Sequence, residues 1–341
     1  MSALAVALAE VEIGPPQVHG NLVMFPLIGQ DQGPLEYATL DEALERGWGR
    51  VTEVSDAGDV NHLLFENLQG RPILLVDGEE LIGAKQNRIT NLTIMAPGTK
   101  TIRIPVSCVE SGRWSYGHGS SERTFSTSEA AHFAEGRADK MRQVTMSLSM
   151  NSRAADQGAV WSSINEKLDQ LVVQTSSSSC TEISVVYDEQ LSEHTTAFET
   201  LPGQRGAIFG IDDDFIGLEL FDQRDTFVQL LPKLIRSYAI DSISRTGANS
   251  RLTSELAARD FLATVAAADI RTHDAIGEGE DIRLLAAGVD GGGLSCDGVV
   301  VQLSAFRSRR ASHRVKSESD VLDDMFSTRR RPLASGGGDD S

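Results

Sequence analysis

The sequence predicts an α+β fold, in which an antiparallel, β-rich N-terminal part precedes a part of mixed helices and strands. Three observations support this prediction. The first third of the chain consists of short apolar runs separated by turn residues, a pattern typical of strands. Helical periodicity begins only at about Glu129. Strand-like runs then return at 206–220 and at 281–306.

The N-terminal part is expected to begin with a strand and a short helix. Residues 21–28 form an apolar run that ends before Gly29, as expected of a buried strand. The motif Thr-Leu-Asp-Glu at 39–42 is a capping box, which predicts a helix that ends near Gly47. Two further runs predict strands, at 51–54 and at 62–68.

Two hairpins are expected next. The apolar run at 72–76 is followed by Asp77-Gly78, a pair that tolerates the positive φ angles of a type I′ turn. We therefore expect residues 79–83 to pair with that run. A second hairpin is expected between residues 88–95 and 100–107, which are separated by a turn that contains proline and glycine.

The return strand of the second hairpin alternates in polarity. Ile102, Ile104 and Val106 share one face, and Cys108 falls in the same register. Pro105 has no N–H to donate to a neighbouring strand, so we expect an edge strand or a bulge at this position.

After residue 115 the pattern changes to helices mixed with strands. Apolar residues recur at spacings of three and four over 160–171 and over 183–198, which predicts two helices. A further helix is expected to begin at an Asp222 N-cap and to kink at Pro232. The other expected elements are a helix at 254–265 and strands at 206–211, 215–220, 281–286 and 299–306.

These elements predict three regions along the chain. Residues 1–115 are expected to form a β-rich domain, and residues 116–306 an α+β domain. Residues 307–341 are expected to be a disordered tail, because they are rich in charge, serine and glycine and lack apolar periodicity.

Composition excludes several classes of function. Acidic residues outnumber basic ones, 49 to 31, so the formal charge of −18 repels nucleic acid, and an anionic ligand needs a local basic pocket. No apolar run is long enough to span a bilayer, so we expect no membrane association and a cytoplasmic location. The three cysteines are widely spaced and no carboxylate–histidine cluster occurs, so we expect no disulfide framework, no metal site and no cofactor.

Four polar side chains follow the first expected hairpin: Lys85, Gln86, Asn87 and Arg88. The flanking strands are strongly apolar, so we expect these side chains at a rim of the sheet, where a rigid scaffold presents binding groups. Lys85 and Arg88 would supply positive charge for an anionic ligand. The alternatives are an ordinary solvated surface and, for Arg88, a structural ion pair with Glu110.

The residues that follow add further candidates. Cys108 is either a buried, small apolar group or a nucleophile, and as a nucleophile it needs a basic neighbour such as Arg113. Glu110 shares its face, where a carboxylate must be paired, at a rim or functional. Trp114 either packs in the core or stacks on a ligand ring.

The same region carries a resemblance to a known family. Residues 76–88 read Val-Asp-Gly-Glu-Glu-Leu-Ile-Gly-Ala-Lys-Gln-Asn-Arg, residues 104–110 read Ile-Pro-Val-Ser-Cys-Val-Glu, and Gly-Arg-Trp follows at 112–114. These runs resemble the signature of the ARG and rhodanese-phosphatase-superfamily-associated protein domain family. Residues 206–209 and 217–221 also resemble its C-terminal half. The family's name implies a setting in ADP-ribose or other NAD-linked metabolism, but it carries over no activity and no catalytic residue.

Three functions agree with these observations. The first is a binding or accessory module for an ADP-ribose-like or related phosphorylated nucleotide, bound by residues 85–88 and Arg113 with Trp114 as a platform for the base. The second is a hydrolase that acts on such a nucleotide with Glu79, Glu80 or Glu110 as general base. The third is a homo-oligomer that needs no small ligand. A catalytic base is distinguished by a shifted pKa and a pocket, whereas a binding module needs donors for phosphate.

Overall fold

The largest sheet joins strands from both ends of the chain. The computed structural model describes residues 3–33, 35–55, 58–111, 124–150, 152–174, 179–245 and 251–308. Nine strands form this antiparallel sheet in the order β1-β3-β13-β14-β18-β17-β16-β15, and β2 also pairs with β3. Their bounds are β1 Glu12–Ile13, β2 Gln17–His19, β3 Leu22–Ile28, β13 Gln204–Ile211, β14 Phe215–Phe221, β15 Asp269–Asp274, β16 Glu280–Leu285, β17 Val289–Cys296 and β18 Val299–Arg307.

Two smaller sheets are built from the first part of the chain and one later strand. A six-stranded sheet has the order β12-β8-β9-β11-β6-β5, and a three-stranded sheet has the order β10-β7-β4. In the smaller one, β4 and β7 run parallel. The bounds are β4 Ala38–Thr39, β5 Gly49–Glu53, β6 His62–Asn67, β7 Ile73–Leu75, β8 Glu79–Gly83, β9 Arg88–Thr90, β10 Ile94–Ala96, β11 Thr101–Cys108 and β12 Phe125–Ala131.

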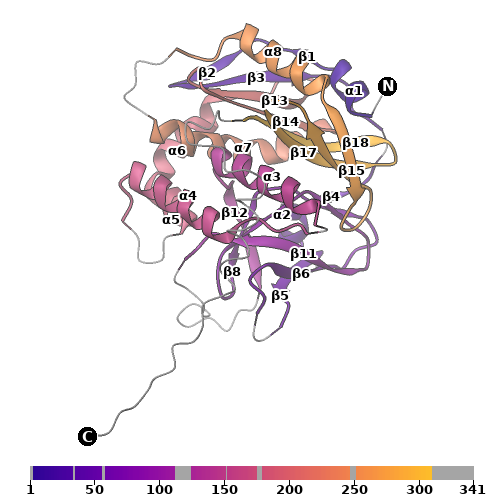
Figure 1. Ribbon diagram of the computed structural model, residues 1–341. Coiled ribbons are helices and arrows are strands. Elements are labelled where there is room, and N and C mark those ends of the chain that lie inside the picture. The colour runs from indigo at the N-terminus through magenta and orange to yellow at the C-terminus, as the bar shows by residue number, and fades with distance from the viewer. Residues whose placement is uncertain are drawn as a thin grey trace, which may run out of the picture. The chain divides into compact units, whose positions relative to one another are not determined.

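Helices cover both faces of the large sheet. Figure 1 shows α1 and α8 on one side of it and α3 and α7 on the other, between the large sheet and the strands of the six-stranded sheet. The bounds of the helices are α1 Ala3–Ala9, α2 Leu40–Glu45, α3 Ala134–Leu148, α4 Gln157–Gln170, α5 Cys180–Val186, α6 Asp188–Ala197, α7 Arg224–Ser244 and α8 Glu255–Ala266. None of these helices combines the length and the apolar character needed to cross a membrane.

Alternation along the central strands explains why both faces are covered. Phe209 of β13 packs with the core that α3 and α7 share, whereas its neighbour Ile208 packs with α1 and α8. On β14, Phe215 and Ile216 divide in the same way. Glu219 of β14 lies on the α3–α7 side, so the strand geometry places a carboxylate inside an apolar core.

The fold class that the sequence predicts is confirmed, since helices accompany mainly antiparallel sheets. The capping box is also confirmed, because the Thr39 side chain accepts a hydrogen bond from the N–H of Glu42 at the start of α2. The helix expected to start at Asp222 begins at Arg224, whose N–H donates to the Asp31 carboxylate instead, and Pro232 lies inside it.

The hairpin expected at Asp77-Gly78 is wrong. β7 pairs with β10 and β4, whereas β8 pairs with β9 and β12, so this turn passes the chain from one sheet to another. Gly78 has a φ angle of 81°, as the turn chemistry predicts, but distant groups hold the turn. The Thr93 hydroxyl accepts from the N–H of Asp77, and the Gly78 carbonyl accepts from the N–H of His132. The hairpin lies one turn later, between β8 and β9.

The second expected hairpin holds only in part. β9 pairs with the end of β11, but β10 pairs with β7 instead. β11 lies between β9 and β6, so the edge strand expected from Pro105 is wrong. Pro105 is the last residue of β11 in register with β6, and Val106 is the first in register with β9. A residue without an N–H is tolerated where the strand changes partner.

Strands from either side of residue 115 share sheets. β12 pairs with β8, and β3 pairs with β13 over seven residues. The described residues up to Ser308 form one compact unit, and residues 309–341 lie outside the described residues. The boundary at 115 and the disordered tail therefore stay predictions.

Candidate functional site

The four polar residues of the sequence motif lie at the end of the β8–β9 hairpin. Lys85, Gln86 and Asn87 form the connection, which starts at Ala84 with a φ angle of 43°, and Arg88 begins β9. All four side chains are buried. An ordinary solvated surface therefore does not describe them, because the hairpin end packs against other segments.

Arg88 is bound to its own turn. Its Nη1 donates to the carbonyl oxygen of Gln86 at 2.9 Å, to the Gln86 side-chain oxygen at 3.1 Å and to the carbonyl oxygen of Asn87 at 3.3 Å. The Gln86 amide in turn donates to the carbonyl oxygen of Glu110. The guanidinium thus ties the hairpin end to the segment after β11.

Carboxylates from two segments converge beside this turn through a chain of hydrogen bonds. The Thr181 hydroxyl donates to Oε1 of Glu80 at 2.9 Å, and the Asn87 amide donates to the same hydroxyl at 2.9 Å. The backbone N–H of Asn87 donates to Oε2 of Glu110 at 3.2 Å. Ser179 caps α5 and forms a backbone bridge with Glu110. We call these five residues, Glu80, Asn87, Glu110, Ser179 and Thr181, the Glu80 cluster.

Glu80 is the titratable group whose environment marks this cluster. Burial raises its pKa to about 7, the hydrogen bond from Thr181 lowers it, and the negative charge of Glu110 raises it again. The carboxyl group therefore binds and releases a proton near neutral pH. Thr181 is only half-buried, so the cluster reaches the surface at α5.

The raised pKa of Glu80 predicts a pH dependence of stability. Between its ordinary value of 4.5 and about 7, the unfolded chain ionises Glu80 while the folded chain keeps it protonated, so folding loses stability as pH rises. We expect wild type to lose about 3 kcal/mol relative to Glu80→Gln over this window. Urea unfolding of both proteins at several pH values measures the difference. A difference that is constant with pH would contradict the raised pKa.

Glu79 faces the opposite side of β8 from Glu80 and belongs to a second group. Its Oε2 accepts from the N–H of Val76 at 2.7 Å, and its Oε1 lies 3.5 Å from Nζ of Lys233. The same Nζ lies 2.5 Å from Oδ1 of Asp41. Burial raises the pKa of Glu79 to about 7, Lys233 lowers it and Asp41 raises it.

Cys108 is buried, as its register predicts. It pairs with Arg88 across β9 and β11, and its thiol contacts the carbonyl oxygen of Val60 at 3.5 Å. Burial raises the pKa of the thiol to about 11, although Arg88 acts in the opposite direction. A thiol of this kind forms little thiolate at neutral pH, so its chemistry is that of a small apolar group.

We therefore expect Cys108 to resist modification in the folded protein. The other two cysteines, Cys180 and Cys296, are also buried, and burial raises the pKa of each thiol. A thiol reagent at neutral pH should label none of them in a fast phase and all three after unfolding in urea. Mass mapping of any rapidly labelled position identifies an exception, and rapid labelling at Cys108 would restore the nucleophile hypothesis.

Sequence reasoning missed the residues that complete the cluster. The run Ser-Cys-Thr-Glu at 179–182 is a capping-box pattern, which predicts the start of α5 and places Ser179 and Thr181 in its first turn. The capping box could therefore have predicted the start of α5. The contact between Thr181 and Glu80 could not be predicted, because the two residues lie 101 positions apart.

A buried cysteine and histidine lie next to the cluster. Cys180 Sγ lies 3.6 Å from Nδ1 of His132. Burial lowers the pKa of His132 to about 3, and the charges of Lys140, Arg137 and Lys167 lower it further. The imidazole is therefore neutral and the thiol protonated, so this pair provides no thiolate.

Ionic contacts fill the layer between the large sheet and the six-stranded sheet. Arg137 of α3 binds Glu219 with both Nη atoms, at 2.7 and 3.2 Å, and the hydroxyls of Ser304 and Tyr238 donate to the same carboxylate. Burial alone lowers the pKa of Arg137, but Glu219 raises it above its ordinary value. Lys140 binds Asp77 and the carbonyl oxygen of Thr90.

Arg113 and Trp114, the remaining sequence candidates, lie outside the described residues. Within the described ranges, no three His, Cys, Asp or Glu side chains are grouped to hold a metal ion.

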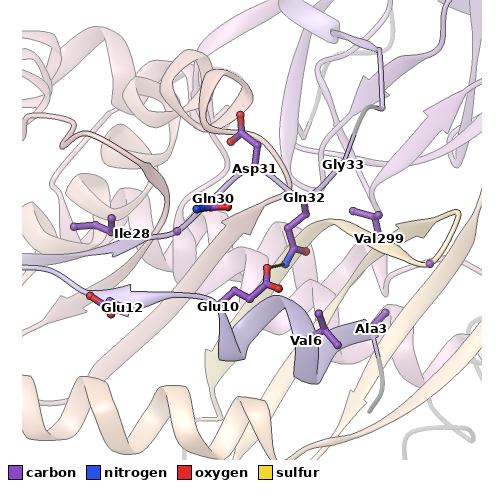
Figure 2. A pocket seen from close by; sticks show the side chains of 12 residues that line it. Ala3, Val6, Glu10, Glu12, Ile28, Gln30, Asp31, Gln32, Gly33 and Val299 are labelled. Carbon is purple, nitrogen blue, oxygen red and sulfur yellow. Dashed lines mark hydrogen bonds between the residues drawn. The ribbon is translucent and has the colours of Figure 1, made fainter.

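A large open cavity of about 860 Å³ lies elsewhere. It is lined by α1, the end of β3 with the loop after it, and the β17–β18 turn, and none of the sequence candidates lines it. Figure 2 shows Glu10, Glu12 and Asp31 around it, and the hydrogen bond from Gln32 to Glu10. Its carboxylates repel an anionic ligand such as a nucleotide.

Comparisons with known proteins bear on the family alone. No curated protein and no solved structure shows a significant match to the chain. The sequence profile of one family, the ARG and Rhodanese-Phosphatase-superfamily-associated Protein domain, matches residues 10–306. This match confirms the resemblance inferred from the runs at 76–88 and 104–114. It also covers the segments that supply the Glu80 cluster, which are β8, the β8–β9 connection, the segment after β11 and the start of α5. The chain therefore belongs to the ARG and Rhodanese-Phosphatase-superfamily-associated Protein domain family.

Proposed function

We propose that the protein is a hydrolase of ADP-ribose or a related phosphorylated nucleotide, with Glu80 as its general base. The convergence of Glu80 and Glu110 through Asn87 and Thr181 carries this proposal. Two carboxylates with different surroundings are a common arrangement for acid–base chemistry, because one binds and releases the proton while the other sets its affinity. The substrate class comes from the family's name, which supports it by association only.

In the proposed step a water molecule replaces the leaving group of the substrate. The ionised Glu80 carboxylate accepts a proton from a water molecule, and the water oxygen forms a bond to the electrophilic centre of the substrate. The bond from that centre to the leaving group breaks, and protonated Glu80 returns the proton to the leaving group. A carboxyl group with a pKa of about 7 suits both transfers near neutral pH.

The basic residues of the hairpin support a binding module less well. Lys85 is buried, and Nη1 of Arg88 is occupied by oxygen atoms of its own turn. Phosphate recognition needs donors presented to the ligand, whereas acid–base catalysis needs a positioned base. The described part of the hairpin carries Glu80, a buried carboxyl group with a pKa raised to about 7, and this favours the hydrolase.

Two measurements on the full chain test the proposal. ADP-ribose is incubated with wild type and with Glu80→Gln, and products are separated by chromatography. Calorimetric titration of Glu80→Gln with ADP-ribose measures binding without turnover. Turnover by wild type alone supports the hydrolase. Binding without turnover by either protein would contradict it in favour of an accessory module. If the protein neither binds nor hydrolyses ADP-ribose, the homo-oligomer is the remaining hypothesis, and light scattering tests it.

A further inference from the structure

A second cavity, of about 440 Å³, lies on the side of the six-stranded sheet that α2 covers. This open cavity is bounded by α2, the start of β5 and the start of β12, and we call it the α2–β12 cavity. A volume of this size suits a small organic molecule. The residues that line it are Asp41, Leu44, Glu45, Gly49, Arg50, Val51, Thr124, Phe125, Ser126 and Thr127.

The lining combines three kinds of group. Thr124, Ser126 and Thr127 carry hydroxyls, which both donate and accept hydrogen bonds. Leu44, Val51 and Phe125 provide apolar surface, and Phe125 is almost fully buried. Asp41 and Glu45 supply carboxylates that accept hydrogen bonds. A ligand that alternates hydroxyl groups with C–H faces, as a sugar ring does, complements all three.

An ion pair with a buried lysine holds the Asp41 carboxylate at the cavity wall. Lys233 of α7 is buried and lies 2.5 Å from Oδ1 of Asp41. Behind it, Oε1 of Glu79 is buried and has no hydrogen-bond partner, and its only close ion-pair contact among the described residues is the 3.5 Å approach to Lys233. The side chain of Asp41 is 33% exposed. Lys233 therefore contacts the Asp41 carboxylate from the protein interior, and part of the carboxylate stays accessible from the cavity.

Charge selects a neutral ligand for this cavity. Lys233 offsets the Asp41 carboxylate, and the lining holds one further acidic and one further basic residue, Glu45 and Arg50, of which Arg50 also lies 3.9 Å from Glu66. A strongly anionic ligand would meet both carboxylates, and a cationic ligand would compete with the ammonium already bound to Asp41. A neutral polyol can bind without repulsion from the carboxylates and without displacing the Lys233 ammonium from Asp41.

We infer that the α2–β12 cavity binds a neutral, polyhydroxylated ligand of about one sugar ring, whose hydroxyls donate to Asp41. None of the residues of the Glu80 cluster lines this cavity, so the two sites consist of different side chains. The inference does not rest on the proposed hydrolase activity. It assigns a separate role to Glu79, whose buried carboxyl group lies 3.5 Å from Lys233 behind Asp41.

D-ribose and D-glucose serve as probes, with saturation-transfer NMR and calorimetric titration of the full chain. We expect weak, saturable binding of at least one of them. Asp41→Asn should weaken it about tenfold or more, since a charge-assisted hydrogen bond is lost. Ser126→Ala removes an exposed hydroxyl from the wall and should weaken it a few-fold while the fold is kept. Asp139→Asn, an exposed carboxylate bound to Arg142 on α3, is the matched control and should change nothing.

Three results would overturn the inference. One is the absence of saturable binding of either sugar by the folded wild type. Another is binding that Asp41→Asn and Ser126→Ala both leave unchanged. The third is saturation of the cavity by spermidine or inorganic phosphate in preference to the sugars. Glu80→Gln should retain sugar binding, so failure of the hydrolase proposal and failure of this inference remain distinguishable.

Discussion

Glu80→Gln is expected to lower kcat for ADP-ribose hydrolysis by about 10²–10⁴-fold, the range that a positioned general base contributes. The amide oxygen of glutamine can still accept the hydrogen bond from Thr181, so the cluster keeps its shape while losing its base. Glu129→Gln on neighbouring β12 is the matched control, because that glutamate side chain is 82% exposed. Initial rates of product formation measure the effect.

The pH profile separates a base from a structural carboxylate. Activity of wild type should rise as pH passes through about 7, because Glu80 must be ionised to accept a proton. Glu110→Gln removes the negative charge that, together with burial, raises the pKa of Glu80, so the rise should move to lower pH. An unshifted profile in Glu110→Gln, or a Glu80→Gln protein that retains full activity, would exclude Glu80 as the base.

Arg137→Met is expected to lower the free energy of unfolding by about 3–5 kcal/mol, because it leaves Glu219 as an uncompensated buried charge. Both side chains are fully buried, and Arg137 also lies over the Phe306 ring. Arg142→Met on the same helix is the control. Its side chain is 44% exposed, and its loss should cost less than about 1 kcal/mol. Urea unfolding monitored by circular dichroism measures both.

A second substitution tests the reason for this loss. Combining Arg137→Met with Glu219→Gln removes both charges, and the double variant should recover part of the lost stability. Tyr238 and Ser304 donate to different oxygens of Glu219, so in Glu219→Gln one hydroxyl would donate to the amide oxygen and the other would accept from the amide nitrogen. If the double variant is less stable than Arg137→Met alone, the cost lies in lost packing and not in an unpaired charge.

Local patterns predicted local structure well. The capping box predicted α2, and alternation predicted the burial of Ile104, Val106 and Cys108 on β11. The wrong predictions concern which strands pair with each other. The turn at Asp77-Gly78 has the conformation that its residues favour, but the strands that flank it pair elsewhere, because pairing depends on distant segments such as β10 and β12.

In the candidate site, too, local features could be predicted from the sequence and long-range contacts could not. Glu80, Asn87 and Glu110 were candidates from the sequence, and the structure brings them together. Lys85 and Arg88 were expected at a rim but are buried, because α5 and the segment after β11 pack around the hairpin end. Charge and apolar pattern report how a segment meets solvent on average. They do not report which remote segment covers it.

The large sheet has a consequence for the order in which the chain folds. β3 pairs with β13, whose residues follow it by about 180 positions. At a synthesis rate of about 5–20 residues per second, the apolar run of β3 waits roughly 10–40 s for that partner. The other strands that hydrogen-bond to β3, β1 and β2, are only two and three residues long. The nascent N-terminal strand therefore presents an unpaired edge to other chains until β13 has been synthesised.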